Sequence, residues 1–369
     1  MKKIIAVILL TVLSVMTFAG FCFKNEKPAC PENEAEAFIR VDRDDFDAWK
    51  RELDNVRILT EGEYELKALD DRELAPSVKG FDTLNISGSA QFSVEQFGKL
   101  ADTLKKFGKT VYIVDTRLES HGFASGIGVS WCGEANGANI GKTLAEVEAD
   151  EKGKTSLIGS SITAYTAVDD EPDQSMTMNV ASWQTERELV ENAGFNYLRL
   201  ICPDHGWPSA DVIDTFIEFV KGIDKDNTWL HFHCQAGKGR TGAFMTIYDM
   251  MKNPDVAVED ILLRQAMTGS GNLYDRSKPE STHAQKERCV MARVIYNYIQ
   301  ENHDTGYAVK WSDWLNAHSQ KLTLCVGCKN CPDAAFSSDT QVVDDTFTAV
   351  GKGQATVLAG DKVYFVTVE

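Results

Sequence analysis

The sequence predicts an α/β fold with a mostly parallel central sheet flanked by helices, and two observations carry this prediction. Apolar segments of strand length alternate along the chain with amphipathic segments of helix length. Such alternation is typical of parallel strands with helices packed against the sheet. With 369 residues, 43% of them hydrophobic, the chain is also long enough to bury a sizeable core.

The alternation can be followed through the middle of the chain. From Phe92 to Phe107 the apolar residues recur at helical spacing, and Gly108 supplies a stop. The pattern then predicts strands over 111–114, 196–201 and 229–233, helices over 183–193 and 210–223, and a further apolar helix from about residue 241.

The first 20 residues have the composition of a secretory signal peptide. Lys2 and Lys3 precede an apolar run that is shorter than the roughly 20 residues of a membrane-spanning helix. We expect a secreted or periplasmic protein with no stable membrane partner, and lipoprotein anchoring at Cys22 is the alternative. Residues 21–37 are polar and acidic and contain two prolines, which predicts a flexible leader.

The main folded unit is predicted over residues 38–319. Within it, residues 142–178 are rich in Thr, Ser, Asp and Glu and interrupt the alternation, which predicts a small inserted β subdomain. Residues 320–369 contain two strand-like segments around Gly360-Asp361. This arrangement predicts a hairpin within a C-terminal β appendage.

The nine cysteines of the chain differ in their surroundings. Cys325, Cys328 and Cys331 lie close together with no histidine nearby, which in an exported chain favours a disulfide over zinc. Cys132, Cys202 and Cys289 lie in apolar segments, where we expect small buried side chains. Cys234 is set apart by the loop that follows it.

The charge of the chain limits its partners. It has 55 acidic and 38 basic residues and a net charge of −17, which repels nucleic acid and anionic membranes at long range. No nucleic-acid partner is expected. A small anionic substrate therefore needs a local basic site.

The segment from His233 to Thr241 carries the predicted chemistry. It reads His-Cys-Gln-Ala-Gly-Lys-Gly-Arg-Thr and joins a predicted strand to a predicted helix. Backbone N–H groups of such a loop, at a helix N-terminus, bind phosphate. Gly237 and Gly239 let the backbone curl, and Arg240 offers a planar fork of donors to two phosphate oxygens.

Cys234 is the predicted nucleophile of a phosphocysteine mechanism. The helix N-terminus and nearby cations lower the pKa of such a thiol, so that it is ionised when substrate arrives. Thr241 is expected to hydrogen-bond the sulfur, and His233 to brace the loop. A core cysteine followed by an ordinary turn is the alternative, but the combined spacing is more specific than a glycine-rich turn.

Asp204 is the predicted general acid, because an alkoxide leaving group needs a proton. It follows the predicted strand over 196–201 and therefore lies at the same carboxyl edge of the sheet as Cys234. A turn or helix-cap role is the alternative for an Asp near Gly and Pro.

At these residues the chain resembles the protein-tyrosine-phosphatase superfamily, whose signature is His-Cys-x5-Arg-Ser/Thr with an Asp on a separate loop. More narrowly, it is similar to the bacterial cysteine phytases, which are protein-tyrosine-phosphatase-like inositol polyphosphate phosphatases. The likeness runs from about Phe38 to His318 and is carried by the segments 84–93, 114–122, 129–131, 203–208 and 301–315.

The resemblance implies a protein-tyrosine-phosphatase-like core with a small partial β-barrel subdomain, and stepwise hydrolysis of inositol polyphosphates without a metal or other cofactor. It makes Cys234 the nucleophile, Arg240 the phosphate clamp and Asp204 the general acid. His205 and Arg40 become substrate contacts. The loop residues Gln235, Ala236, Gly237, Lys238 and Gly239 would hold the phosphate, and Lys238 adds a cation.

Two departures from the family pattern bear on substrate preference. Where the family has Gly-Glu-Arg-Asp, this chain has Gly133-Glu134-Ala135-Asn136. Before the long late helix only Lys278, Lys286 and Arg288 stand in for the lysines of the family, and Lys286 and Arg288 are kept as candidate substrate contacts.

Three other functions compete with an inositol phosphatase. A phosphotyrosine or phosphoinositide lipid phosphatase would use the same mechanism, and the Lys238 loop also reads like those of lipid phosphatases. A non-catalytic module that binds phosphorylated ligands and a rhodanese-like sulfur transferase are the others, and the intact set of Cys234, Arg240 and Asp204 argues against both. The oligomeric state and the first phosphate attacked are not predicted.

Overall fold

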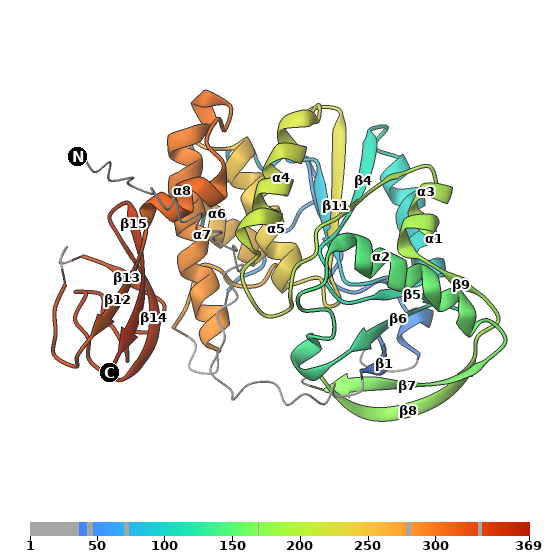
Figure 1. Ribbon diagram of the computed structural model, residues 1–369. Helices are drawn as coiled ribbons and strands as arrows, with labels where there is room; N and C mark the ends of the chain where they lie inside the picture. The colour runs from blue at the N-terminus through green and yellow to red at the C-terminus, as the bar shows by residue number, and fades with distance from the viewer. Residues whose placement is uncertain (1–36, 43–46, 70–73, 169, 278–281, 331–333) are drawn as a thin grey trace, which may run out of the picture.

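The computed structural model describes residues 37–42, 47–69, 74–168, 170–277, 282–330 and 334–369. These residues form three sheets, and the helices lie mainly around the central one (Figure 1). The predicted signal peptide and leader lie outside the described residues. No helix in the described part is long and apolar enough to cross a membrane.

The central sheet has the strand order β10-β4-β11-β3-β2. Its strands are β10 (Asn196–Arg199), β4 (Thr110–Asp115), β11 (Thr228–His233), β3 (Ile86–Ser89) and β2 (Arg57–Leu59). The first four run parallel, which confirms the predicted sheet, and β2 pairs antiparallel to β3 at one edge. Every residue of β11 is buried, so the strand that leads to Cys234 is held on all sides.

Helices cover both faces of this sheet. One face packs against α1 (Val94–Lys105) and α3 (Glu186–Asn192), and the other against α4 (Ala210–Gly222), α5 (Gly239–Lys252), α6 (Val258–Met267), α7 (His283–Asn302) and α8 (Trp311–His318). Side chains alternate along β4, so Ile113 lies in the hydrophobic core on the side of α1 and α3, while Val114 lies in the core on the opposite face of the sheet. These two cores hold the central sheet between them and so fix the edge at which its parallel strands end.

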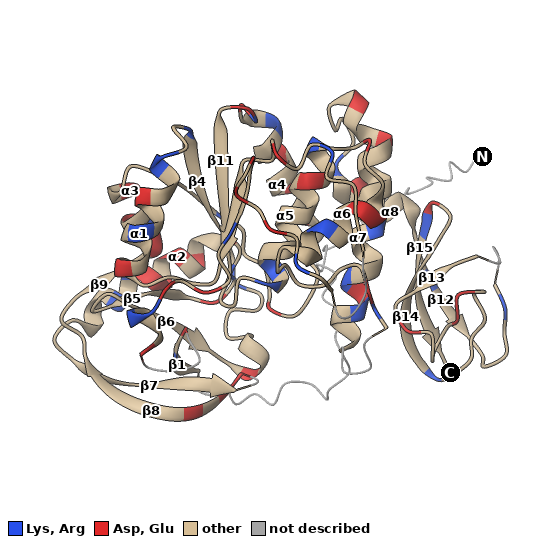
Figure 2. Cartoon of the chain, turned by 180° about the vertical axis from the view of Figure 1, so that it is seen from behind, with Lys and Arg blue, Asp and Glu red and all other residues tan. Residues whose placement is uncertain are grey.

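The second sheet has six strands in the order β8-β7-β1-β6-β5-β9. They are β8 (Glu171–Asn179), β7 (Ser161–Val168), β1 (Phe38–Val41), β6 (Ile127–Cys132), β5 (His121–Ala124) and β9 (Trp183–Gln184). In the described chain the end strands β8 and β9 do not pair, so the sheet is open. The hairpin of β7 and β8 contains acidic residues but no lysine or arginine (Figure 2).

Two segments differ from the expected pattern. The stretch 142–178 begins with α2 (Leu144–Gly153) and a 3-10 turn, η3 (Lys154–Leu157), because Thr143 and Glu146 form a capping box. Only its second half supplies strands. The helix expected over 183–193 is shorter, because Thr185 caps α3 and the residues before it form β9. Three further 3-10 turns are η1 (Ala48–Lys50), η2 (Glu134–Asn136) and η4 (His303–Thr305).

The C-terminal residues form the third sheet, in the order β12-β15-β14-β13. Its strands are β12 (Ser319–Leu324), β13 (Phe336–Ser337), β14 (Gly353–Ala359) and β15 (Lys362–Val368), and β14 and β15 form the predicted hairpin. Cys325 and Cys328 form a disulfide, whereas Cys331 lies outside the described residues. The sheet contacts α7, where Thr356 Oγ1 donates to Glu287 Oε1 at 2.8 Å.

Candidate active site

The loop after β11 presents its amides to one side, as the sequence predicts for an anion cradle. Four of its carbonyl oxygens accept hydrogen bonds from the surrounding chain: Gln235 O from Gln91 N (3.0 Å), Ala236 O from Asn55 Nδ2 (2.8 Å), Gly237 O from Arg57 Nη1 (2.7 Å) and Lys238 O from Gly271 N (3.0 Å). In a planar trans peptide, the N–H that follows a carbonyl points the opposite way. The amides of residues 236–239 therefore face the inner side of the loop.

Gly237 is required by both conformation and space. Its φ of +72° lies in the left-handed region that L side chains rarely adopt. A Cβ at this position would lie 2.4 Å from the backbone of Ser89 and Ala90 at the end of β3. The loop can therefore curl against β3 only with glycine at position 237.

Cys234 lies at the base of this loop, buried, with its Sγ accepting from Gly237 N at 3.2 Å. Thr241 is fully buried, and its hydroxyl has no hydrogen-bond partner in the described part of the chain. His233, the residue before Cys234, is held in place by two contacts. Its carbonyl accepts from Thr116 Oγ1 at 2.7 Å, and its Nε2 lies 2.6 Å from Glu186 Oε1. The bracing role predicted for His233 agrees with this geometry.

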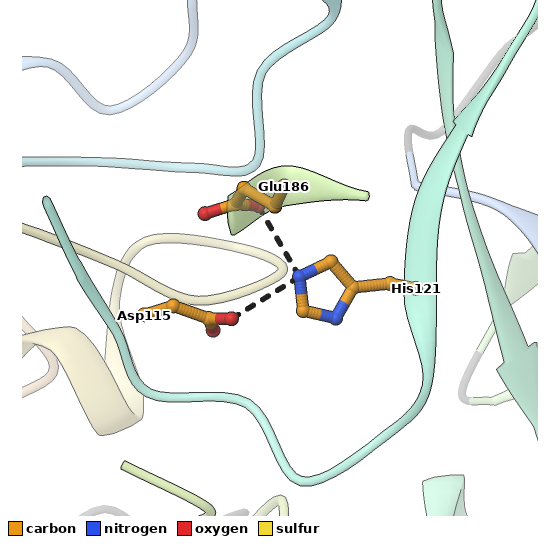
Figure 3. A group of neighbouring side chains, drawn as sticks. All are labelled: Asp115, His121 and Glu186. Carbon is orange, nitrogen blue, oxygen red and sulfur yellow. Dashed lines mark hydrogen bonds and ion pairs between the residues drawn. The ribbon is translucent and has the colours of Figure 1, made fainter. Parts of the chain in front are cut away.

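The support of His233 continues into a buried group of Asp115, His121 and Glu186 (Figure 3). His121 Nε2 lies 3.2 Å from a carboxylate oxygen of each of the other two. Burial opposes a charge on His121, yet Asp115 raises its pKa to about 10. Arg199 Nη1 also lies 2.9 Å from Asp115 Oδ2. Protein cations thus already neutralise both carboxylates, and we interpret the group as a structural support of the loop.

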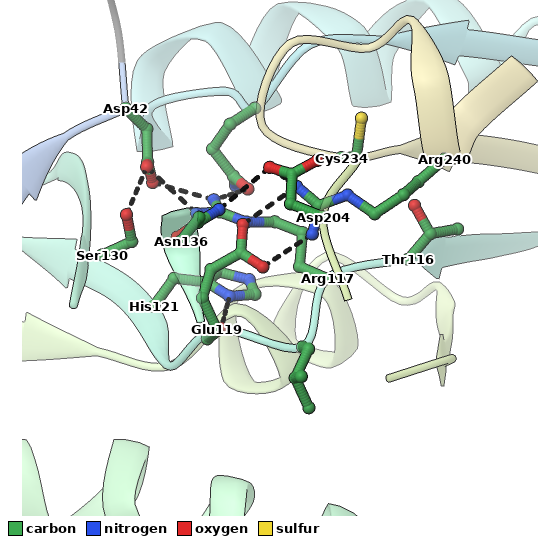
Figure 4. A network of polar contacts seen from close by, with 12 residues as sticks. Asp42, Thr116, Arg117, Glu119, His121, Ser130, Asn136, Asp204, Cys234 and Arg240 are labelled. Carbon is green, nitrogen blue, oxygen red and sulfur yellow. Dashed lines mark hydrogen bonds and ion pairs between the residues drawn. The ribbon is translucent and has the colours of Figure 1, made fainter. Parts of the chain in front are cut away.

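Two hydrogen bonds to Glu119 fix the guanidinium of Arg240. Its Nη1 and Nη2 donate to the two carboxylate oxygens of Glu119 at 2.6 and 3.0 Å (Figure 4). Glu119 also accepts from Arg117 Nε at 2.8 Å, and Arg117 is held in turn by both oxygens of Asp42. Burial opposes the charge on Arg240, but Asp204 and Glu119 hold its pKa well above the usual value. The guanidinium is fixed and charged.

Asp204 lies directly against this clamp. Its Oδ2 accepts from Arg240 Nη2 at 2.8 Å and from Asn136 Nδ2 at 2.9 Å (Figure 4). Burial favours the neutral acid, but Arg240, His205 and Asn136 together hold the pKa of Asp204 below its usual value. The structure therefore brings the predicted acid and the predicted clamp together as an ion pair.

Arg40 and His205 share one partner, Asp170. Asp170, in the turn between β7 and β8, accepts from Arg40 Nη1 at 3.0 Å and pairs with His205 Nε2 at 2.7 Å. Arg40 also approaches the Glu119 carboxylate, at 3.8 Å. The hydrogen bond to Asp170 raises the pKa of His205, although burial opposes this. Both predicted substrate contacts thus border the site.

The remaining candidate substrate contacts, on the loop and in α7, differ in their placement. Lys238 and Ala236 are exposed on the loop, and Gln235 is half-buried. Arg288 lies against the loop, since a Cβ at Gly239 would meet its Nη1 at 2.6 Å. Lys286 lies two residues earlier in α7, and residues two apart in a helix do not share a face. The helix therefore does not present Lys286 together with Arg288.

Residues 114–252, which include the loop and Asp204, match the model of the PTP-like phytase family. The description of this family names inositol hexakisphosphate. Among solved structures, the chain is similar to the tandemly repeated protein tyrosine phosphatase like phytase from Mitsuokella multacida, with 37% identity and a TM-score of 0.68. A PTP-like phytase from Bdellovibrio bacteriovorus has 29% identity and a TM-score of 0.53, with 72% of this chain and 96% of that chain covered. The fold is that of the PTP-like phytases.

Two further proteins are similar to this chain. The Mitsuokella multacida enzyme is also known in complex with myo-inositol-(1,3,4,5)-tetrakisphosphate, with 36% identity to this chain and a TM-score of 0.67. Effector protein hopD2 from Pseudomonas syringae pv. tomato is 25% identical over 253 residues, which is 64% of this chain. The chain spans about half the length of these relatives: 50% of the Mitsuokella protein and 52% of the Pseudomonas protein. The similarity to the Mitsuokella structures covers 77% of this chain.

Several residues of this site were not assigned a role from the sequence. They are Asp42, Arg117, Glu119 and Asp170, together with Asn136, which was noted only as a departure from the family. The sequence did contain a signal that two of these residues belong to the site. Arg117 and Glu119 follow β4, so the carboxyl-edge reasoning that selected Asp204 applies equally to them.

Proposed function

We propose that this chain is a phosphoric monoester hydrolase that removes phosphate from myo-inositol polyphosphates through a phosphocysteine intermediate. The observation that carries the proposal is the convergence of three groups at one sheet edge. Cys234 lies under a ring of inward-facing amides, Arg240 is fixed beside it by Glu119, and Asp204 contacts Arg240 (Figure 4). This set contains a nucleophile, an anion clamp and an acid.

The reaction then follows from these positions. The amides of residues 236–239 and Arg240 hold the three non-bridging oxygens of the phosphate. The Cys234 sulfur attacks phosphorus, the bond to the ester oxygen breaks, and that oxygen takes the proton of Asp204. Water next attacks the phosphocysteine while the Asp204 carboxylate accepts a proton from it. The sulfur–phosphorus bond breaks, the thiolate returns and inorganic phosphate leaves.

Substrate binding prepares Asp204 to act as the acid. In the structure the pKa of Asp204 is lowered, with Arg240 as the main stabilising partner of its carboxylate. A bound phosphate competes for the same guanidinium and places negative charge beside Asp204. Both changes raise the pKa of a carboxyl group. Arrival of the substrate therefore favours the protonated form that the first step uses.

The proposed substrate class is an inositol polyphosphate because cations surround the clamp as well as forming it. Arg40 and Arg288 border the site, and Lys238 is exposed on the loop itself. The family description names inositol hexakisphosphate, and the Mitsuokella relative is known with an inositol tetrakisphosphate. A substrate with several phosphates uses such a set of cations more fully than a single phosphotyrosine does.

The test is phosphate release by the purified protein from phytate, lower inositol phosphates, a phosphotyrosine peptide and a phosphoinositide in micelles. Inositol phosphates should be hydrolysed with the highest kcat/KM, and chromatography of the products should show stepwise removal of phosphate. Cys234→Ser serves as the blank for contaminating phosphatases. A phosphotyrosine peptide or lipid turned over far faster than every inositol phosphate would overturn the proposal.

We also propose that the protein is exported, on the basis of residues 1–20. Expression with and without these residues, followed by fractionation and N-terminal sequencing of the mature chain, tests this. A processed chain outside the cytoplasm is expected. An unprocessed chain that stays in the cytoplasm would contradict export.

A further inference from the structure

Asp170 occupies a position between the two predicted substrate contacts that lie outside the loop. Its Oδ1 accepts from Arg40 Nη1 at 3.0 Å and its Oδ2 lies 2.7 Å from His205 Nε2. The Asp170 side chain is only 15% exposed, and that of Arg40 is 4% exposed. One carboxylate thus partly neutralises two cations at the rim of the catalytic groups.

The guanidinium of Arg40 lies among the carboxylates of Asp42, Glu119 and Asp170. Within the described part of the chain, its Nε and Nη2 are buried and have no hydrogen-bond partner. Its Nη2 lies 3.8 Å from the same Glu119 oxygen that accepts from Arg240 Nη2 at 3.0 Å. Its Nε lies 3.7 Å from Asp42 Oδ1. Arg40 therefore connects Asp170 to the carboxylate that holds the phosphate clamp, and the partly exposed Asp170 carboxylate forms a subsite beside that clamp.

We propose that Asp170 makes this subsite accept a hydroxyl rather than a phosphate on the carbon next to the reacting position. The inference rests on the proposed inositol polyphosphate phosphatase activity. The preferred substrates are then inositol phosphates that have already lost part of their phosphate groups. A hydroxyl can donate to the Asp170 carboxylate, which accepts only. A phosphate has to approach the carboxylate as a like charge, or displace it from Arg40 and His205 and leave it without partners.

Nothing basic on the hairpin offsets the Asp170 charge. The charged residues of β7 and β8 are Glu171 and Asp173, both acidic and exposed. Asp170 itself has a φ of +64°, a conformation that Asp and Asn tolerate better than other L residues. Asp170→Asn therefore removes the charge and keeps the turn.

The experiment compares the wild-type protein, Asp170→Asn and Asp173→Asn on inositol hexakisphosphate, a panel of inositol tetrakisphosphate isomers and p-nitrophenyl phosphate. Asp173→Asn makes the same charge change on the same hairpin, away from Arg40 and His205. In Asp170→Asn, the kcat/KM for hexakisphosphate relative to the best tetrakisphosphate should rise about tenfold, mainly through a lower KM. In Asp173→Asn this ratio should stay as in the wild-type protein.

Different failures can be told apart. A wild-type protein that releases phosphate from p-nitrophenyl phosphate but from no inositol phosphate would overturn the proposed function and this inference with it. A wild-type protein active on inositol phosphates, with an unchanged ratio in Asp170→Asn, would overturn the inference alone. An equal loss on all substrates, with a wild-type circular dichroism spectrum, would also overturn it, because Asp170 would then only position His205 and the Asp204 loop.

Discussion

Asp204 and Arg240 are hydrogen-bonded to each other, with Asp204 Oδ2 2.8 Å from Arg240 Nη2. The two groups that the proposed reaction needs in contact with substrate are therefore partners in the ligand-free structure. Burial raises the pKa of Asp204, but the guanidinium outweighs burial and the carboxyl stays below its usual pKa. A phosphate that takes the place of Asp204 at Arg240 should raise this pKa and so favour the acid form.

Asp204→Asn should lower turnover of inositol phosphates by about 10²- to 10⁴-fold, the usual contribution of a general acid. Turnover of p-nitrophenyl phosphate should fall far less, because its leaving group needs little protonation. Steady-state kcat on both substrates measures the difference. An equal fall on both would mean that Asp204 positions the substrate, and His205 would be the next candidate for the acid.

Anion binding should be coupled to proton uptake by Asp204. In the free protein the pKa of Asp204 is lowered, and an anion at Arg240 raises it. At a pH between these two pKa values, binding should convert the carboxylate to the acid. Calorimetric titration with sulfate, in buffers of different ionisation enthalpy, measures the proton uptake. Asp204→Asn should bind sulfate without it, and equal uptake by both proteins would contradict the coupling.

Cys234→Ser should release no phosphate and still bind inositol phosphates, because a serine hydroxyl stays un-ionised where a thiolate is required. Binding is measured by calorimetry and turnover by phosphate release. Rapid quenching of the wild-type protein during turnover should yield a chain whose mass is increased by one phosphoryl group on Cys234. Measurable turnover by the serine variant would end the phosphocysteine mechanism.

Gly237→Ala should abolish turnover and destabilise the protein more than Gly108→Ala does. Both glycines have a positive φ, so both variants carry the strain of roughly 1–2 kcal/mol for an L residue in this region. A Cβ at Gly108 meets open space, whereas at Gly237 it meets the backbone of Ser89 and Ala90. Urea unfolding measures the difference, and equal stability of the two variants would show that the loop does not pack on β3 as described.

Glu119→Gln should destabilise the fold by about 3–5 kcal/mol, the usual cost of removing one partner from a buried ion pair. Glu119 is fully buried and pairs with Arg117 and Arg240. Glu191→Gln is the matched control, because its pair with Arg187 is on the surface and worth about 0–1 kcal/mol. Urea unfolding at neutral pH should separate the two variants clearly.

The pH dependence of that stability has a definite sign. Burial raises the pKa of Glu119, but Arg240 and Arg117 hold it well below its ordinary value. The ionised carboxylate therefore stabilises the fold above the pKa of the unfolded chain, and this contribution is lost as the pH falls through the folded-state pKa. The wild-type protein and Glu119→Gln should converge in stability only in acid.

Local patterns were enough to predict the central sheet and the loop. The strand β11, the loop and α5 are continuous in sequence, so spacing alone predicts that Cys234, Gly237 and Arg240 belong to one strand–loop–helix unit. The prediction of Asp204 needed one further rule, that parallel strands end at the same edge of a sheet. The six-stranded sheet was predicted less completely, because β1, β5, β6 and β9 come from three separate stretches of chain outside residues 142–178.

The sequence by itself was enough to predict a nucleophile, a clamp and an acid, because each prediction rests on a short segment with a fixed spacing. Only the tertiary structure decided their partners. Glu119 and Arg240 are 121 positions apart, Arg40 and Asp170 are 130 apart, and Asn136 and Asp204 are 68 apart. A buried charge needs a partner, but no local pattern states which distant residue supplies it. That choice depends on how two sheets meet at one edge, where packing of both sheets brings these side chains within hydrogen-bonding distance.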